Sequence, residues 1–247
     1  MAKVTTGIKG LDELLQGGYP ERSTILVSGT PGSGKTIFGL QFLVEGARKG
    51  EKGIYITFEE TVDEIKQQGL QFGWDLKAMQ EKNLLRVLNI KAMNVRIDRV
   101  LEEIEKLVKG FGAQRVVFDS LTTLITCAEL LEGIEISRDF KNMENITMPV
   151  VFGDAVIRKS ILSLIERMRV WDITILLTSE LPDNSPYLSR DTVSEFLVDG
   201  VVKLKKAMGK RLLMIEKMRS TKHPLVEFSF SIEQTGVMIS EGEVRKW

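Results

Sequence analysis

Several kinds of chemistry are scarce or missing in this sequence. Its 247 residues include one cysteine, Cys127, and one histidine, His223. A single cysteine excludes a disulfide within the chain, and neither residue can build a metal site of cysteines or histidines alone. A lone thiol fits a reducing compartment, so we expect a cytoplasmic protein. Because the sequence has neither the roughly 18-residue apolar run of a membrane span nor a signal peptide, we expect no membrane association.

The sequence also lacks an excess of charge of either sign. Lysine and arginine total 34, as do aspartate and glutamate, so the overall field favours neither nucleic acid nor an anionic membrane as a partner. The hydrophobic share of 43% and the charged share of 28% are typical of globular proteins. The length is common for an α/β fold in one piece, and we predict a single domain over residues 1–247.

Short apolar runs rich in β-branched residues predict buried parallel strands, at 23–29, 53–58, 84–90, 115–118 and 174–179. Between them, apolar residues follow helical spacing over 97–108 and 157–168. This alternation predicts an α/β fold with a mainly parallel sheet and helices on both faces. After residue 199, strand patterns joined by a turn near 207–210 predict an antiparallel extension of the same sheet.

Two local signals and one irregular stretch complete this organisation. Thr61 and Glu64 form a predicted capping box that opens a helix, and Gly17-Gly18 is predicted to end a short helix over 10–16. The stretch from Asp119 to Thr174 is longer than one crossover helix needs. We therefore predict an insertion at 127–153.

A complete phosphate-binding loop follows the first predicted strand, with the sequence Gly29-Thr30-Pro31-Gly32-Ser33-Gly34-Lys35-Thr36. In such a P-loop, backbone N–H groups and the positive end of the next helix surround phosphates, and glycines permit the close approach. We expect Lys35 to reach the β- and γ-phosphates of ATP, and the Thr36 hydroxyl to bind Mg²⁺. A chance glycine-rich turn is the alternative, but a strand and a helix flank the motif.

Acidic residues end two of the predicted strands. Asp119 follows the apolar run 115–118, where its carboxylate can bind Mg²⁺ through a water; an ordinary helix cap is the alternative. Glu59 and Glu60 follow the run 53–58, at the sheet edge where open α/β proteins bind ligands. Strand alternation allows only one of the two glutamates to face the γ-phosphate, and we favour Glu59 as the group that orients the attacking water. A solvated strand end is the alternative.

A basic run near the C-terminus extends from Lys217 to His223. Lys217 and Arg219 are two residues apart, so on a strand they share a face and can form a cationic pair aimed at a phosphate. Taken alone, the pair is equally compatible with a basic strand face exposed to solvent.

Together these motifs resemble the KaiC-like branch of the RecA superfamily, and the resemblance extends over nearly the whole chain. The residues that carry it, besides the P-loop, are Thr6-Gly7-Ile8, Gly10-Leu11-Asp12-Glu13-Leu14-Leu15, Gly17-Gly18, Thr57-Phe58-Glu59-Glu60-Thr61, Phe72-Gly73-Trp74-Asp75-Leu76, Asp119-Ser120 and the run from Lys217 to His223.

The resemblance implies a RecA-type ATPase that forms a ring, commonly a hexamer, with ATP at each subunit boundary. Glu59 and Glu60 match the paired catalytic glutamates of the family. Lys217, Arg219 and His223 match the run that reaches the nucleotide of the neighbouring subunit, which gives the basic pair a role in trans. The sequence departs from the protein that names the family by carrying one such domain instead of two, so a circadian role does not transfer, and by the predicted insertion.

Three alternatives stay open. A recombination or repair ATPase stimulated by DNA would share the fold, but acidic residues outnumber basic ones over 128–154 and 181–199, the stretches that bind DNA in RecA relatives. A basic cluster at 203–211 favours that alternative unless it is a solvated hairpin face. A nucleotide-gated scaffold with little hydrolysis is the second alternative. Autophosphorylation near residues 191–194 is the third.

Overall fold

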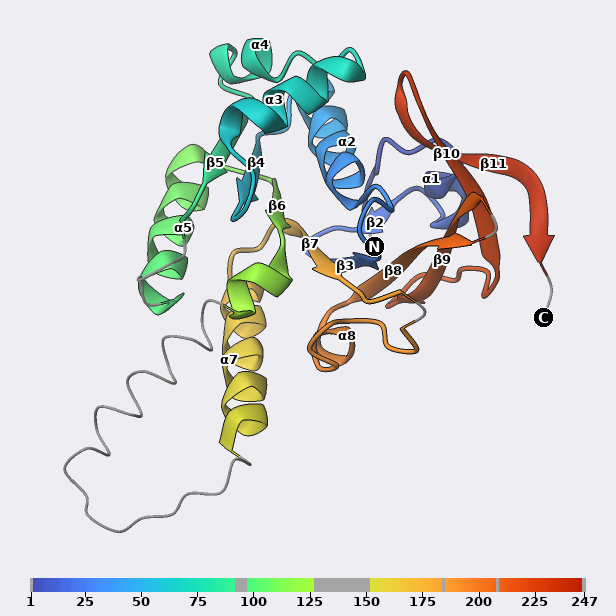
Figure 1. Cartoon of the computed structure of the whole chain (residues 1–247). Helices are drawn as coiled ribbons and strands as arrows, with labels where there is room; N and C mark the ends of the chain where they lie inside the picture. The colour runs from blue at the N-terminus through green and yellow to red at the C-terminus, as the bar shows by residue number, and fades with distance from the viewer. Residues whose placement is uncertain (1, 92–96, 127–151, 184, 208, 246–247) are drawn as a thin grey trace.

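The computed structural model describes residues 2–91, 97–126, 152–183, 185–207 and 209–245. Its central feature is a nine-stranded sheet with the order β11-β10-β9-β8-β3-β7-β6-β4-β5 (Figure 1). Of the predicted insertion at 127–153, residues 127–151 lie outside the described residues, and 152–153 begin helix α7 (Phe152–Arg169). Within the described ranges, no helix is long and apolar enough to cross a membrane.

The predicted parallel strands form the core of the sheet. Strand β3 (Thr24–Gly29) lies between β7 (Thr174–Glu180) and β8 (Gly200–Ala207). Beyond β7 follow β6 (Arg115–Asp119), β4 (Gly53–Thr57) and β5 (Leu85–Asn89), all parallel to their neighbours. Every residue of β3 and β4 is buried, because helices cover both faces, and this explains why their sequences are continuously apolar.

Helices form one layer on each side of this sheet (Figure 1). Helix α2 (Lys35–Arg48) packs with Ile25 and Val27 of β3, whereas Leu26 faces the second core. That second core holds residues of α5 (Ile97–Phe111) and α7. The alternation along β3 therefore supplies both cores, and it confirms the predicted α/β class with helices on both faces.

Smaller elements surround the sheet. The predicted capping box at the start of α3 (Val62–Gln71) is confirmed. The Thr61 side chain accepts the Glu64 backbone N–H, and the Glu64 side chain accepts the Thr61 backbone N–H. Helix α4 (Leu76–Glu81) follows it, and α8 (Ser194–Leu197) precedes β8. Helix α1 (Leu11–Leu14) ends before the left-handed glycines that were predicted to stop it, and β1 (Lys3–Val4) pairs with β2 (Tyr19–Pro20).

The C-terminal strands extend the sheet as predicted. Strands β9 (Lys210–Met218), β10 (Glu227–Glu233) and β11 (Gly236–Arg245) follow β8 with antiparallel pairing. Strand β9 ends at Met218, so Arg219 lies beyond it, and a register shift opposite Lys217 interrupts the ladder. Arg219 lies just past the strand, but its backbone N–H donates to the Asp199 carbonyl oxygen at 2.8 Å. The side chains of Lys217 and Arg219 both donate to the Phe196 carbonyl oxygen, so the two lie on the same side, as predicted.

One buried side chain of α2, that of Gln41, connects the N-terminal segment to β11. The Gln41 amide nitrogen donates to the carbonyl oxygens of Gly7, at 2.7 Å, and Val237, at 3.1 Å. Its amide oxygen accepts the Val237 N–H at 2.7 Å. Helix α2, which begins at the P-loop, is thus fixed to the N-terminal segment and to β11 by one buried amide.

Candidate nucleotide-binding site

The predicted P-loop connects β3 to α2, and two of its glycines have left-handed backbones. Gly32 has a φ of 71° and Gly34 a φ of 105°. A Cβ on Gly34 would also lie 2.8 Å from the Ile232 Cδ1 atom of β10. Any residue with a side chain would be strained at either position, so this loop shape needs both glycines. Helix α2 begins directly after Gly34, and its positive N-terminal end therefore belongs to the loop.

Lys35 extends back over this loop. Its ammonium group donates to the carbonyl oxygens of Gly29, at 3.0 Å, and Thr30, at 3.2 Å, and lies 3.9 Å from the Glu180 carboxylate. Burial lowers the pKa of Lys35, and the nearby carboxylates of Glu180, Asp119 and Glu59 oppose that shift. These carboxylates favour the charged form of the lysine.

The Asp119 carboxylate accepts hydrogen bonds from three hydroxyl groups. Thr36 and Tyr55 donate to its Oδ2 atom at 2.8 and 2.5 Å, and Thr178 donates to Oδ1 at 2.5 Å. Strands β4, β6 and β7 and the first turn of α2 therefore converge on one carboxylate. The Thr36 hydroxyl and the Asp119 carboxylate together supply hard oxygen atoms of the kind that Mg²⁺ prefers, so the pair fits that ion.

Glu59 and Glu60 both lie just past the end of β4. Glu59 is exposed and accepts a hydrogen bond from the Thr123 hydroxyl, and Glu60 accepts one from the Gln68 amide at 2.6 Å. Burial raises the pKa of Glu60, and the bond from Gln68 opposes that shift. Both glutamates line the same cavity, because the strand ends at Thr57 and alternation no longer separates them.

A cavity of about 380 Å³ brings these groups together. Its lining residues are Pro31, Gly32, Gly34, Lys35, Thr36, Ile37, Thr57, Glu59, Glu60, Gln68, Asp119, Ser120, Glu180, Arg211 and Ile232. In the loop itself, the buried hydroxyls of Thr30 and Ser33 have no hydrogen-bond partner in the described part of the chain. A cavity with a P-loop, cations and a hydroxyl–carboxylate pair fits a nucleotide triphosphate with Mg²⁺.

Seven lining residues were not predicted as site residues from the sequence, among them Glu180, Arg211 and Ile232. Glu180 ends β7 as Asp119 ends β6, so the strand-end argument could have found it. Arg211 and Ile232 come from β9 and β10, and no local motif marks either residue. Only the return of the antiparallel strands over the P-loop places them there.

The basic run from Lys217 to His223 lies apart from this cavity. The Lys217 ammonium donates to the backbone carbonyls of Glu195, Phe196 and Val198, at 3.0, 3.3 and 2.6 Å. Burial and the neighbouring Arg219 lower the pKa of Lys217. Arg219 pairs with Asp199 at 3.2 Å, and His223 Nδ1 lies 3.4 Å from the Pro224 oxygen. None of the three basic residues lines the cavity around Lys35 of the same chain.

Residues 191–194 form a tight turn that leads into α8. The Asp191 carboxylate accepts the N–H groups of Val193, at 2.8 Å, and Ser194, at 2.6 Å, together with the Ser194 hydroxyl at 2.8 Å. Ser194 is fully buried. Of the hydroxyls at 191–194 that were considered for autophosphorylation, that of Ser194 is thus buried and bound to Asp191.

Comparison with known proteins agrees with this architecture. A family model described as the KaiC ATPase matches residues 4–143 and 145–244. The circadian clock oscillator protein KaiC of Prochlorococcus marinus is 32% identical over 250 residues, which cover 96% of this chain and 45% of that protein. The chain therefore spans about half the length of the clock proteins it matches.

Relatives of similar length also exist. The UPF0273 protein PH0284 of Pyrococcus horikoshii is 31% identical over 263 residues, covering 99% of this chain and 96% of that protein. The crystal structure of the KaiC-like protein PH0186 from Pyrococcus horikoshii matches with a TM-score of 0.78 at 30% identity, covering 97% of this chain and 99% of that one. With its P-loop, its sheet order and these matches, the chain belongs to the KaiC-like family of ATPases within the RecA superfamily of P-loop proteins.

Proposed function

We propose that this protein binds ATP with Mg²⁺ in the cavity beside β3 and hydrolyses it. The observation that carries the proposal is the hydrogen bond of 2.8 Å between Thr36 and Asp119, at the start of the helix that follows the P-loop. The two residues come from distant parts of the sequence, and their meeting at this point supplies the metal-binding half of a P-loop nucleotide site.

Each residue has a role in this proposal. Lys35 holds the β- and γ-phosphates, and the backbone of residues 29–34 surrounds them. Thr36 and Asp119 hold Mg²⁺, which when bound neutralises charge on the phosphates. Glu59 orients the attacking water and accepts its proton, because it is the exposed member of the pair at the open side of the cavity. Glu60, held by Gln68, supports this arrangement.

The active form in this proposal is a ring, with six subunits favoured. Lys217 and Arg219 contact the segment 195–199 of their own chain and do not line their own cavity. In a ring, these two residues and His223 reach the nucleotide of the adjacent subunit, where Arg219 stabilises charge on the transferred phosphoryl group. Assembly then controls turnover.

Complementation between two inactive variants tests this arrangement. Lys35→Ala removes the phosphate contact, and Arg219→Ala removes the group supplied in trans, so each homo-oligomer is expected to turn over ATP slowly. Co-expression gives mixed oligomers in which an intact cavity faces an intact Arg219, and turnover is expected to recover part of the wild-type rate. Mass photometry on the same samples reports the number of subunits. A mixture no more active than its components, although mixed oligomers form, would show that Arg219 does not act in trans.

The same preparation separates the remaining alternatives. In a DNA-stimulated ATPase, single-stranded DNA would raise turnover, and its binding would weaken steeply with salt. The basic hairpin gives that alternative little support, because Lys203 and Lys205 are held by carbonyl groups and by Glu227. A nucleotide-gated scaffold would change its mass with ATP but release almost no phosphate.

A further inference from the structure

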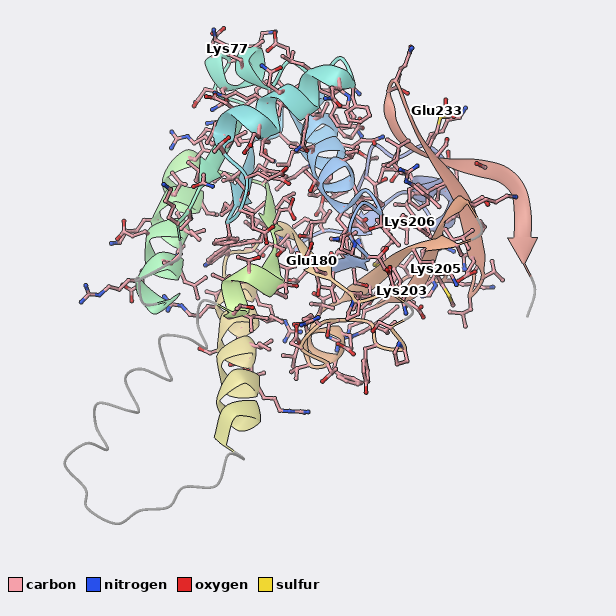
Figure 2. All side chains as sticks on the ribbon, in the orientation of Figure 1. Lys77, Glu180, Lys203, Lys205, Lys206 and Glu233 are labelled. Atoms are coloured by element: carbon pink, nitrogen blue, oxygen red, sulfur yellow. The ribbon has the colours of Figure 1, made fainter. Side chains whose placement is uncertain are left out.

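The basic cluster at 203–211 divides between the two faces of the β8–β9 hairpin. Lys203 donates to the carbonyl oxygens of Ser185 and Tyr187, and Lys205 forms an ion pair with Glu227. Leu204 packs in the core that contains α2, and alternation along the strand puts Lys206 on this same face. Figure 2 labels the three lysines along β8. Lys206 is thus the lysine of β8 that faces the P-loop helix.

Contacts at the P-loop agree with this placement. The Lys206 ammonium lies 3.5 Å from the position that a Cβ on Gly32 would occupy. Arg211 pairs with Lys206 across the two strands and lines the cavity. Ile232, from the adjacent strand β10, approaches Gly34. The hairpin therefore lies beside the loop and brings a cation to Gly32; Arg211 lines the cavity, and Lys206 stands next to that lining.

The charges at this point favour an anion. The Lys206 ammonium lies at Gly32, three residues before Lys35 in the same loop, and Arg211 adds a third cation from the same hairpin face. Cations that lie close together repel one another, whereas each of them is attracted to an anion placed between them. The polyphosphate of a nucleotide bound in the P-loop would carry several negative charges to these cations.

We propose that Lys206 is a phosphate-binding residue supplied in cis by the β8–β9 hairpin, and that it contacts the terminal phosphate of a nucleoside triphosphate. The proposal rests on the proposed function of the P-loop. The terminal phosphate is the one contacted because the Lys206 ammonium lies at Gly32, three residues before Lys35, whose side chain is expected to reach the β- and γ-phosphates. Lys206 then helps the protein to distinguish a triphosphate from a diphosphate.

Equilibrium binding of ATPγS and ADP to four proteins tests this role: the wild type, Lys206→Ala, Lys206→Arg and Lys205→Ala. Lys205→Ala is the matched control, because it removes the same charge from the opposite face of the same strand. We expect Lys206→Ala to weaken ATPγS binding about tenfold, the effect of one charge-assisted hydrogen bond, and to weaken ADP binding by less than about threefold. Lys206→Arg should retain most of the affinity, and Lys205→Ala should bind as the wild type does.

Several results would overturn the proposal. Wild-type affinity for ATPγS in Lys206→Ala would show that the lysine makes no contact. Equal losses in Lys206→Ala and Lys205→Ala would indicate a general effect of hairpin charge, and equal losses for ATPγS and ADP would exclude a contact with the terminal phosphate. If the wild type bound neither nucleotide, the proposed function would fail as well; if only Lys206→Ala departed from expectation, the proposed function would stand. Circular dichroism of each variant verifies the fold.

Discussion

Two tyrosines are fully buried and differ in whether the hydroxyl group has a partner. The Tyr55 hydroxyl donates to Asp119 at 2.5 Å, whereas the Tyr19 hydroxyl has no partner among the residues that the structure describes. Replacing each tyrosine with phenylalanine removes the same atom from two different environments. The pair therefore measures how much free energy the contact with the Asp119 carboxylate contributes.

The expected magnitudes follow from the partners. A hydrogen bond to a charged group contributes about 1.5–3 kcal/mol, and Thr36 and Thr178 continue to donate to Asp119 in the variant. We therefore expect Tyr55→Phe to lower the free energy of unfolding by about 1.5 kcal/mol. Burial, and then the charge of Asp119, raise the pKa of Tyr55 well above its ordinary value, so the hydroxyl keeps its proton at neutral pH. Tyr19→Phe removes a desolvated hydroxyl and should be neutral or stabilising by up to about 1 kcal/mol.

Guanidinium unfolding followed by tryptophan fluorescence measures the difference, because Trp74 and Trp171 are buried. Protein concentration is held constant, since assembly contributes to stability, and midpoints are compared only if the m-values agree. The two variants should differ by about 2 kcal/mol, with Tyr55→Phe the less stable. Equal shifts in both, or a Tyr55→Phe variant as stable as the wild type, would refute the reasoning.

Three further predictions concern other parts of the site and its support. Gly34→Ala should destabilise the protein by about 1–2 kcal/mol and weaken ATPγS binding, because its φ is 105° and its Cβ would meet Ile232; thermal melting and calorimetric titration measure the two effects. Arg115 is buried and bonds to Glu51, Thr5 and Phe42, so Arg115→Met should cost about 3 kcal/mol in urea unfolding, and an unchanged midpoint would contradict this. Burial raises the pKa of Glu60 in the folded state, so this residue's contribution to stability is full below its unfolded pKa and is lost as pH rises through the folded pKa. Glu60→Gln should remove that decline from the profile of stability between pH 4 and neutral pH, and a profile parallel to the wild type would argue against it.

The strands and the P-loop could be predicted because their signals are local. A parallel strand covered on both faces is mostly apolar without alternation, as residues 25–27 are, and the glycines of the P-loop stand at fixed spacing. Asp119 was predicted from its place at a strand end. Its contacts with Tyr55 and Thr178 were not, because they depend on the register of three strands that are distant in sequence.

The hairpin shows where prediction from sequence fails. Lys203, Lys205 and Lys206 look alike in the sequence, and a solvated basic face is the ordinary interpretation of such a cluster. Which lysine faces the P-loop is decided by the alternation of β8 and by the return of β10 beside Gly34. Arg219 illustrates the same limit, since its contacts with Asp199 and Phe196 depend on how β9 lies beside the segment 195–199, which spacing alone does not give.

The buried amide of Gln41 has a consequence for the order of events during synthesis. Gln41 and the P-loop leave the ribosome before Val237, which contacts both polar ends of that amide and is translated 196 residues later. Until β10 and β11 have emerged, the face of α2 that they cover is open to water, and Gly34 lacks its contact with Ile232. A nascent chain therefore carries the whole P-loop sequence well before it has a finished site, and its nucleotide pocket is completed only when β10 and β11 have been translated.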